Sequence, residues 1–256
     1  MSRFDAILFD LFDTLVVFER DRLPEVSVNG RVIRSTAGQV HRRLADFMPG
    51  IELPAFVNGL LWSWQEAERI RAATHREVSA PERFDMLFRH LGHEPDGLPA
   101  GTIGALLAEH MRELSRAVVF PAHHRPLLEA LRQRHRLALV SNFDYTPTAH
   151  HLLEREGVAH LFDLVVVSAD VGWRKPSPVI FEAALGGLGV AAGRALFVGD
   201  RADIDVAGAR GVGIPVAWIN RGAVALAAGE VAPDFEIRDL DELRAIAGIA
   251  AHPPRI

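Results

Sequence analysis

The stretch Ala6-Ile7-Leu8-Phe9-Asp10-Leu11-Phe12-Asp13-Thr14-Leu15 places an aspartate directly after four apolar residues. An uninterrupted apolar run is typical of a strand in a parallel sheet, because helices cover both faces of such a sheet. Aspartate is a poor strand residue, and a buried carboxylate costs several kcal/mol unless it is paired or bound to a metal ion. Helix capping is the main alternative explanation for Asp10. The stretch therefore predicts a first strand that leads into a functional carboxylate.

Further short apolar runs alternate with helical patterns along the chain, which is typical of an α/β fold. The expected strands are Phe4–Phe9, Leu137–Ser141, Leu164–Ser168, Ala195–Val198, Pro215–Ile219 and Phe235–Ile237. The helices expected between them are Pro126–Arg134, Pro147–Glu156, Pro178–Leu188 and Asp205–Arg210, in which proline suits a first turn. These elements predict a three-layer, Rossmann-like core with a parallel sheet.

Residues 17–116 lack such strands, and their apolar residues recur at helical spacing. The helices expected there are Val40–Phe47, Ala55–Ala73, Glu82–Leu91 and Ile103–Leu114. The aromatic residues Phe56, Trp62 and Trp64 could line a pocket, but we expect them to be core, as aromatic residues on a helix more often are. The segment Val26–Ile33 places Asn29-Gly30 between alternating apolar residues, which is typical of a β-hairpin. We therefore expect a core domain of residues 1–16 and 117–256, and an inserted, mainly helical domain of residues 17–116 with a small hairpin near its start.

The composition excludes several classes of protein. The chain has 256 residues, 49% of them hydrophobic, and a formal net charge of -5 without a basic stripe, so nucleic acid is not an expected partner. No apolar run reaches the roughly 20 residues of a membrane span. We therefore expect a cytoplasmic protein with no membrane partner, either a monomer or a homodimer, whose tail His252–Ile256 frays. Cysteine is absent, which excludes disulfides and thiolate chemistry.

The chain contains a single lysine, Lys175, among its 28 basic residues. Arginine can replace lysine on most surfaces, but not where a compact charge on a flexible stem must enter a small site. Lys175 is therefore either a functional residue or a chance survivor.

Four of the predicted strands lead into polar residues, namely Asp10, Ser141, Asp170 and Asp200. In an open parallel sheet, ligands bind beyond the carboxyl ends of the strands. Taken singly, Asp200 could be a turn residue and Ser141 a helix cap. Their expected convergence at one edge of the sheet favours a functional site.

Four motifs follow one another at these strand ends. They are Phe9-Asp10-Leu11-Phe12-Asp13-Thr14-Leu15, Val140-Ser141-Asn142, Arg174-Lys175-Pro176 and Val198-Gly199-Asp200 with Asp205. In their order and spacing, the chain resembles the haloacid dehalogenase-like hydrolase superfamily, in the subclass with an inserted helical cap. The resemblance covers nearly the whole chain and implies a hydrolase.

The resemblance implies that Asp10 is the nucleophile, which forms an aspartyl-phosphate that water then hydrolyses. Asp10 and Asp200, with the backbone carbonyl of Phe12 and several waters, would hold Mg²⁺. Asp205 has the position that orients the surroundings of the metal, whereas Asp203 could equally face solvent.

The same resemblance implies binding groups for a small anionic substrate, in this case a phosphorylated metabolite. Lys175 would neutralise the nucleophile and the transferring group. Ser141, together with backbone N–H groups near Phe12 and Asn142, would donate to the phosphoryl oxygens, and Thr14 would assist there.

The sequence departs from the phosphatase pattern two residues after Asp10. A second aspartate normally protonates the leaving group at this position, but the chain has Phe12. Asp13 is a poor substitute unless the loop twists, because residues i and i+3 of an extended chain face opposite sides. The acid is then missing or is supplied by the cap. Dehalogenases also lack this aspartate, so a metal-independent 2-haloacid dehalogenase with an aspartyl-ester intermediate is the alternative, although Asp200 would then only repel substrate. A catalytically weak binding paralogue is a third possibility.

Other patterns in the sequence suggest a dinucleotide site, a histidine metal centre and an anion-binding surface. Gly208–Gly213 resembles the glycine-rich turn of dinucleotide-binding proteins. That turn follows the first strand of the sheet, whereas this segment follows a predicted helix, so we do not expect a dinucleotide site. The pairs His123-His124 and His150-His151 could indicate a metal centre, yet no carboxylate partners are evident, and we expect surface histidines. The arginines expected in the cap are either an anion-binding mouth or a solvated face: Arg20, Arg22, Arg34, Arg42 and Arg43.

Overall fold

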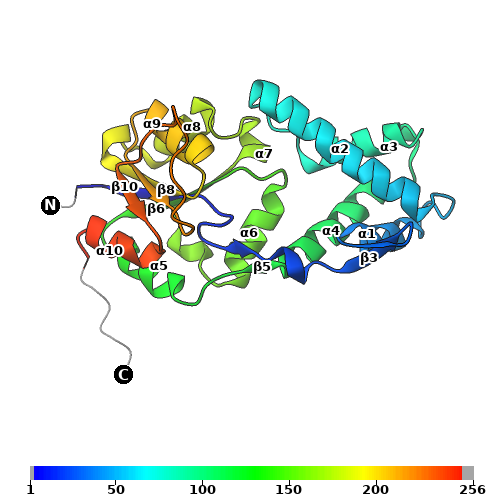
Figure 1. Ribbon diagram of the computed structural model, residues 1–256, viewed down its shortest axis with the longest axis horizontal. Helices are drawn as coiled ribbons and strands as arrows, with labels where there is room; N and C mark the ends of the chain where they lie inside the picture. Colours follow the sequence, from blue (N-terminus) through cyan, green and yellow to red (C-terminus); the bar gives the residue numbers. More distant parts are fainter. Residues whose placement is uncertain (1–2, 250–256) are drawn as a thin grey trace. The chain divides into compact units, whose positions relative to one another are not determined.

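The computed structural model describes residues 3–249, so the expected fraying of the tail His252–Ile256 lies outside the described residues. The chain separates into two compact units, which Figure 1 draws together. We call residues 1–17 with 120–256 the core unit, and residues 18–119 the helical unit. Each unit is described by itself below.

The core unit is built on a six-stranded sheet in the order β10-β9-β8-β1-β6-β7. Its strands are β1 (Ala6–Phe9), β6 (Arg136–Ser141), β7 (Leu164–Val167), β8 (Ala195–Gly199), β9 (Val216–Ile219) and β10 (Phe235–Ile237). Every pairing between neighbours is parallel. All six expected strands are therefore confirmed, with β1 inside the sheet between β8 and β6.

Helices cover both faces of this sheet and produce three layers (Figure 1). They include α5 (His124–Arg132), α6 (Thr146–Arg155), α8 (Pro178–Leu188) and α9 (Ala207–Gly211). α8 and α9 pack on the face to which Ala6 and Leu8 point, in one apolar cluster with the strands. α5 and α6 lie on the other face, to which Ile7 and Phe9 point, because alternate residues of a strand face opposite sides. The predicted α/β architecture is confirmed.

One expected helix of the core unit differs. The helix predicted over Asp205–Arg210 is preceded by a π-helical turn, η5 (Ala202–Val206), and α9 begins only at Ala207. Single π-turns often occur at functional sites, because they re-aim a side chain within a helix. The short elements that periodicity does not reveal are α7 (Ser168–Val171), α10 (Leu243–Ile246), η3 (Ala159–Leu161), η4 (Ala192–Arg194) and η6 (Leu240–Glu242).

The helical unit contains the four expected helices and the expected hairpin. The helices are α1 (Ala37–Leu44), α2 (Leu53–Thr74), α3 (Ala80–His90) and α4 (Thr102–Arg116), with short turns η1 (Arg20–Arg22) and η2 (Pro95–Gly97). Strands β3 (Glu25–Val28) and β4 (Arg31–Arg34) pair antiparallel. Asn29 and Gly30 connect them with φ of 50° and 76°, as a tight type I′ turn requires. Two further short strands, β2 (Val17–Phe18) and β5 (Val118–Val119), pair with each other.

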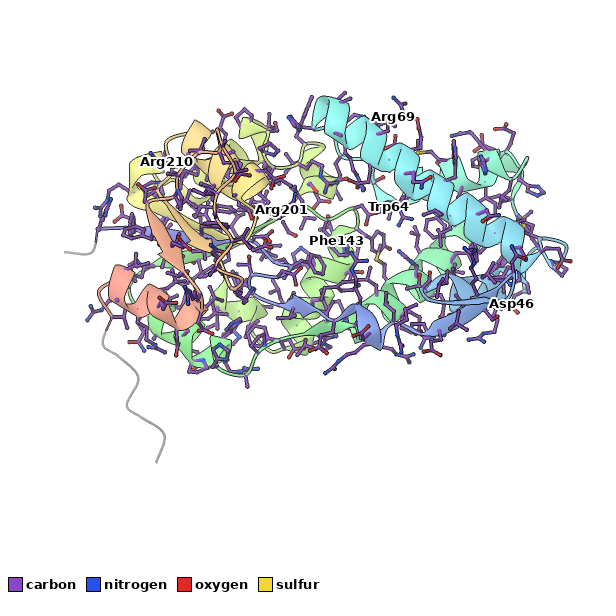
Figure 2. The ribbon with its side chains drawn as sticks, in the orientation of Figure 1. Asp46, Trp64, Arg69, Phe143, Arg201 and Arg210 are labelled. Carbon is purple, nitrogen blue, oxygen red and sulfur yellow. The ribbon has the colours of Figure 1, made fainter. Side chains whose placement is uncertain are left out.

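The aromatic residues of α2 follow the prediction only in part. Phe56 is fully buried, but Trp62 and Trp64 are 37% and 51% exposed, so the expectation that they are core is wrong. Trp64 is labelled on α2 in Figure 2. Trp62 stacks on His90 with ring centroids 4.2 Å apart, which covers one face of the indole without burying it.

The five arginines of the helical unit that could form an anion-binding mouth are all exposed, and most of them have local partners. Arg22 pairs with Glu19, Arg34 with Glu25 at 2.9 Å, and Arg43 with Asp46 at 2.6 Å. Such pairs are typical of a solvated face. Within residues 3–249, no helix is long and apolar enough to cross a membrane.

Candidate active site

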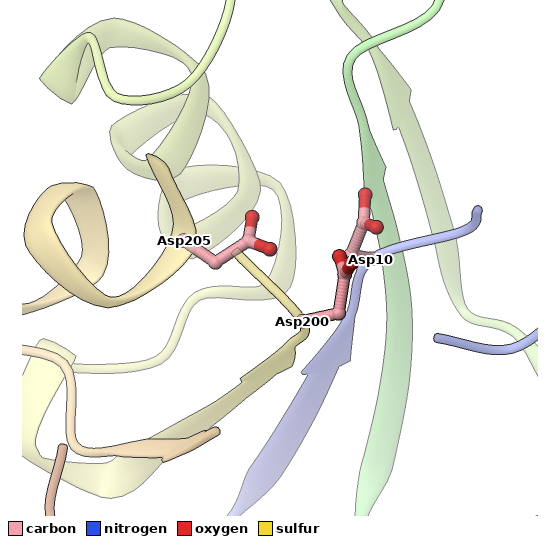
Figure 3. A group of neighbouring side chains, drawn as sticks. All are labelled: Asp10, Asp200 and Asp205. Carbon is pink, nitrogen blue, oxygen red and sulfur yellow. The ribbon is translucent and has the colours of Figure 1, made fainter. Parts of the chain in front are cut away.

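The central strands of the core unit bring three carboxylates together. The chain winds from β1 towards β6 and β7 on one side, and later towards β8, β9 and β10 on the other, so β1 and β8 flank the point where the winding reverses. Ligands of α/β sheets bind beyond the carboxyl ends of the strands at such a point. Asp10, Asp200 and Asp205 each offer an oxygen there, all within 4.8 Å of one another (Figure 3).

Asp205 reaches this cluster because Gly199 leaves room for it. A Cβ at Gly199 would collide with the Asp205 carboxylate, so a side chain there would push Asp205 away. The π-helical turn η5 carries Asp205 back over the end of β8, where the backbone N–H of Arg201 donates to Asp205 Oδ2 at 3.1 Å. Asp205 is 1% exposed. The glycine and the turn together explain how a carboxylate six residues beyond the end of β8 enters the site.

The only lysine of the chain lies among these carboxylates. Lys175 Nζ donates to Asp10 Oδ1 at 2.6 Å and lies 2.8 Å from Asp205 Oδ1, and the side chain is 2% exposed. The sequence makes Lys175 conspicuous but carries no signal for how the residue is held. The side chain of Asn142 accepts from the Lys175 N–H at 2.7 Å and donates to the Lys175 carbonyl at 2.9 Å. Asn142 therefore fixes the backbone that presents the ammonium.

The ionisation of the cluster reflects its crowding. Burial raises the pKa of Asp10 to about 6; the charge of Asp205 adds to this, and Lys175 opposes it. Burial also raises the pKa of Asp200 to about 7, with further contributions from Asp10, Asp205 and Asp13. Burial alone would lower the pKa of Lys175, but the two carboxylates outweigh it and raise that pKa. One ammonium thus faces three carboxylates.

This donor set fits a divalent cation. A hard cation such as Mg²⁺ takes oxygen ligands and commonly binds one or two carboxylates together with substrate oxygens. Three carboxylates against one ammonium leave uncompensated negative charge, and this repulsion adds to the burial that raises the pKa values of Asp10 and Asp200. Bound positive charge would relieve it.

Two buried hydroxyl groups near the ends of the central strands lack partners. Thr14 and Ser141 are both fully buried, and neither hydroxyl has a hydrogen-bond partner among the described residues. A buried polar group without a partner is costly, so such groups call for an explanation. Donation to an oxygen of a bound anion would satisfy both.

Several candidate residues lie elsewhere or differently from what the sequence suggested. Asp203 is exposed and forms a bidentate pair with Arg201 at 2.9 and 2.7 Å. Asp170 lies in α7, where it accepts from Thr146 at 2.8 Å. Phe12 packs edge-on against Phe143, which Figure 2 labels, with ring centroids 5.0 Å apart. Phe12 therefore presents an aromatic ring where the phosphatase pattern has an acid.

The loop that follows Asp10 contains one residue with a left-handed backbone. Asp13 is exposed and has φ of 55°, the left-handed region that residues other than glycine rarely adopt. The backbone turns at Asp13, so the argument against Asp13 as an acid, which holds for an extended chain, does not apply to this loop.

The patterns that suggested other sites have structural explanations. Gly208 lies in α9, where an added Cβ would meet Phe181 at 2.5 Å and the Pro176 backbone at 2.9 Å, so the glycine permits close packing. His150 and His151 are exposed, as expected. His124 is 1% exposed, which contradicts its expected place on the surface. Its Nδ1 lies 2.9 Å from the carbonyl of Leu15.

A family model describes this arrangement. Residues 4–213 match the model of the haloacid dehalogenase-like hydrolases. The chain belongs to this family. The resemblance stated from the four motifs is thereby confirmed, and the protein is a haloacid dehalogenase-like hydrolase with a parallel-sheet core and an inserted helical unit.

Relatives within the family include phosphatases. The chain is 35% identical to a phosphoserine phosphatase of Thermus thermophilus over 159 residues. This aligned region covers 62% of this chain and 63% of the relative. It therefore spans less than two thirds of that protein. It is 29% identical over 235 residues to a glyceraldehyde 3-phosphate phosphatase of Methanopyrus kandleri, 91% of this chain and 92% of the relative. Among solved structures, a 2-haloacid dehalogenase of Pseudomonas syringae shares the fold with a TM-score of 0.65 and 24% identity over 96% of this chain and 98% of that one.

The buried ion pairs predict a large stability loss without Lys175. Lys175→Met leaves Asp10 and Asp205 buried without a counter-charge, which should cost about 3 to 5 kcal/mol of unfolding free energy at pH 8. The loss should shrink at pH 5, where protonation relieves the repulsion. Urea denaturation in EDTA at both pH values measures it. Lys175→Arg retains the charge but not the compact shape, so it should recover only part of the unfolding free energy that Lys175→Met loses. A methionine variant as stable as wild type at pH 8 would contradict the role of this pair.

Asp200 predicts a stability change of the opposite sign. Its pKa of about 7 lies above that of an unfolded aspartate, so the folded protein retains a proton that the unfolded chain releases. Stability of the metal-free protein should therefore fall as the pH rises from about 4 to about 7. Asp200→Asn lacks this penalty and should be more stable than wild type at pH 8 in EDTA, with little difference at pH 4. A variant that is less stable than wild type at pH 8 would refute the electrostatic account.

Proposed function

We propose that this hydrolase is a Mg²⁺-dependent phosphatase of small phosphorylated metabolites. The observation that carries the proposal is the cluster of Asp10, Asp200 and Asp205 around one ammonium. The two phosphatase-named relatives support the substrate class, because their names describe enzymes of small phosphate esters.

The reaction would proceed through an aspartyl-phosphate. The carboxylate of Asp10 attacks phosphorus and displaces the alcohol or phenol oxygen of the ester, and water then hydrolyses the acyl phosphate and regenerates the carboxylate. Lys175 holds Asp10 in place and neutralises charge as the phosphoryl group approaches. The hydroxyls of Ser141 and Thr14, with backbone N–H groups near Phe12 and Asn142, donate to the phosphoryl oxygens, where the charge develops.

Mg²⁺, when bound, would neutralise substrate oxygens in the transition state. Asp10, Asp200 and the backbone carbonyl of Phe12 are the ligands we propose for it. Asp205 orients Lys175 rather than meeting substrate, since its carboxylate is buried between the ammonium and the Arg201 backbone. In this proposal residues 1–16 and 117–256 form the catalytic domain, and residues 17–116 form the cap that selects substrate.

The alternative, a metal-independent 2-haloacid dehalogenase, is weaker for an electrostatic reason. A haloacid carries its own carboxylate, and Asp200 would add a second negative charge beside Asp10 without a compensating ion. The similar dehalogenase structure supports the shared fold only, because its sequence is 24% identical.

The proposal is tested by the hydrolysis of an activated aryl phosphate. Turnover should vanish in EDTA and return with Mg²⁺, because the carboxylates alone repel an anionic substrate. Asp10→Asn should abolish turnover while its circular dichroism and melting profile remain those of a folded protein. Metal-independent halide release from a haloalkanoate, with no phosphatase activity, would overturn the assignment in favour of the dehalogenase.

The phenylalanine at position 12 predicts a preference for good leaving groups. An alkoxide must be protonated as it departs, whereas an activated phenolate need not be, and general acid help is typically worth about 10² to 10⁴ in rate. Phe12→Asp should therefore raise kcat for an alkyl phosphate relative to an aryl phosphate, by up to about 100-fold.

Phe12→Ala is the matched control for this change. It removes the edge-on contact with Phe143 without supplying an acid, so the ratio of alkyl to aryl kcat should stay at the wild-type value. If both variants shift the ratio equally, or if neither does, the missing acid does not limit the reaction.

A further inference from the structure

The loop that follows Asp10 is held from outside by side chains distant in sequence. We call residues 10–15 the Asp10 loop. Three successive backbone carbonyls of this loop, those of Asp13, Thr14 and Leu15, each contact a basic side chain. Arg221 donates to the carbonyl of Asp13 through one terminal nitrogen and to that of Thr14 through the other, the latter at 3.4 Å. His124 holds the third.

His124 acts here as a neutral donor. Burial lowers its pKa to about 4, so the ring is uncharged at pH 7 and Nδ1–H donates to the Leu15 carbonyl at 2.9 Å. Arg221 differs, because it brings a full charge and two parallel donors to adjacent peptide groups.

Arg221 has few other partners that would explain it. Among residues 3–249, its guanidinium forms no ion pair with a carboxylate, whereas Arg201 pairs with Asp203 and Arg210 with Asp234. The backbone around Arg221 is anchored, since the side chain of the preceding Asn220 both donates to the carbonyl and accepts from the N–H of Val224. A prepared segment after β9 thus directs a guanidinium at the Asp10 loop.

These contacts bear directly on groups of the site. A peptide group is planar, so a fixed carbonyl also fixes the N–H on its other side. The two carbonyls that Arg221 holds belong to the peptides before and after Thr14, and together they fix the direction of the Cα–Cβ bond from which the buried Thr14 hydroxyl extends. Only the φ and ψ of Asp13 separate the first of these peptides from the peptide that contains the Phe12 carbonyl.

The left-handed backbone of Asp13 is the part of the loop that most needs support. Aspartate adopts a positive φ more readily than most residues, but the conformation is still uncommon, and contacts from the surroundings stabilise it. Backbone hydrogen bonds from the N–H groups of Leu15 and Val16 to the Leu11 carbonyl also hold this turn, and Arg221 adds a contact from outside at the peptide that follows Asp13. Arg221 also lines, together with Asp200, a pocket of about 390 Å³ beside the cluster, so it lies near the carboxylates that the loop serves.

We propose that Arg221 is a positioning residue for the Asp10 loop. By holding the peptides on both sides of Thr14, it keeps the Phe12 carbonyl at the divalent cation and the Thr14 hydroxyl at the phosphoryl group. This inference rests on the proposed function, because the cation and the phosphoryl group are the ligands that the loop would serve. Arg221 contacts neither of them in this account and acts only through the loop.

The test compares Arg221→Met and Arg221→Lys with Arg210→Met, a control that removes an exposed, ion-paired arginine elsewhere in the core unit. Binding of Mg²⁺ is followed without substrate, as the rise in melting temperature with Mg²⁺ concentration, which reports ligand affinity for the folded state. Arg221→Met should weaken Mg²⁺ binding about 10- to 100-fold, the range typical of lost supporting contacts around a metal. Arg221→Lys keeps the charge but cannot span two carbonyls, so it should bind Mg²⁺ nearly as weakly as Arg221→Met. Arg210→Met should bind Mg²⁺ with wild-type affinity.

Kinetics with an aryl phosphate at saturating Mg²⁺ add a second readout. KM should rise in Arg221→Met, because the Thr14 hydroxyl is then misdirected. In a separate rescue experiment, added guanidinium ion should restore part of the activity of Arg221→Ala, because it can occupy the space that the guanidinium group leaves. It should not restore the activity of Lys175→Ala. A protein with wild-type Mg²⁺ affinity and KM after Arg221→Met would overturn the proposal, as would an equal loss in Arg210→Met. If the wild-type protein itself shows no Mg²⁺-dependent shift and no phosphatase activity, the proposed function fails instead.

Discussion

The site depends on one ion-pair arrangement, the ammonium of Lys175 between the carboxylates of Asp10 and Asp205. Two buried carboxylates this close repel each other strongly, and the water that would screen them is largely excluded. The lysine makes their burial tolerable, and Asn142 fixes the backbone from which the lysine extends. Asp200 then adds a third carboxylate that this single charge does not balance. The carboxyl ends of β1 and β8 therefore carry an excess of carboxylates, which further positive charge would balance.

The fold explains how residues about 190 positions apart in sequence meet at this point. Parallel pairing of β1 with both β6 and β8 aligns their carboxyl ends, so that Asp10, Ser141 and Asp200 all emerge at one edge. Position alone does not bring in Asp205, which reaches the cluster through the π-helical turn and the missing side chain of Gly199. The same sheet edge presents the unpartnered hydroxyls of Thr14 and Ser141. Carboxylates suited to a cation and hydroxyls without partners thus come from the same edge of the sheet, a combination that fits the phosphoryl transfer we propose.

Different parts of this arrangement could be predicted from sequence to different degrees, for physical reasons. Buried parallel strands leave long apolar runs in the sequence, so the sheet could be predicted. A lysine in a chain that otherwise uses arginine is conspicuous, so the importance of Lys175 could be predicted as well. Periodicity carries no information on side chains that bond to distant backbone. The clamp of Asn142 on Lys175 and the contact of Arg221 with residues 13 and 14 join segments 33 and about 207 residues apart, and neither has a local pattern. The burial of His124 was missed for the same reason, since its partner is the Leu15 carbonyl.

In the proposed function, Asp10 and Asp200 share one divalent ion beside Lys175. Anomalous diffraction from crystals soaked in Mn²⁺, which accepts the same oxygen ligands as Mg²⁺, tests it without recourse to activity. The account predicts one strong peak in contact with a carboxylate oxygen of each aspartate, and no peak there in crystals of Asp200→Asn. Manganese bound elsewhere with this position empty, or an undiminished peak in the asparagine variant, would contradict it.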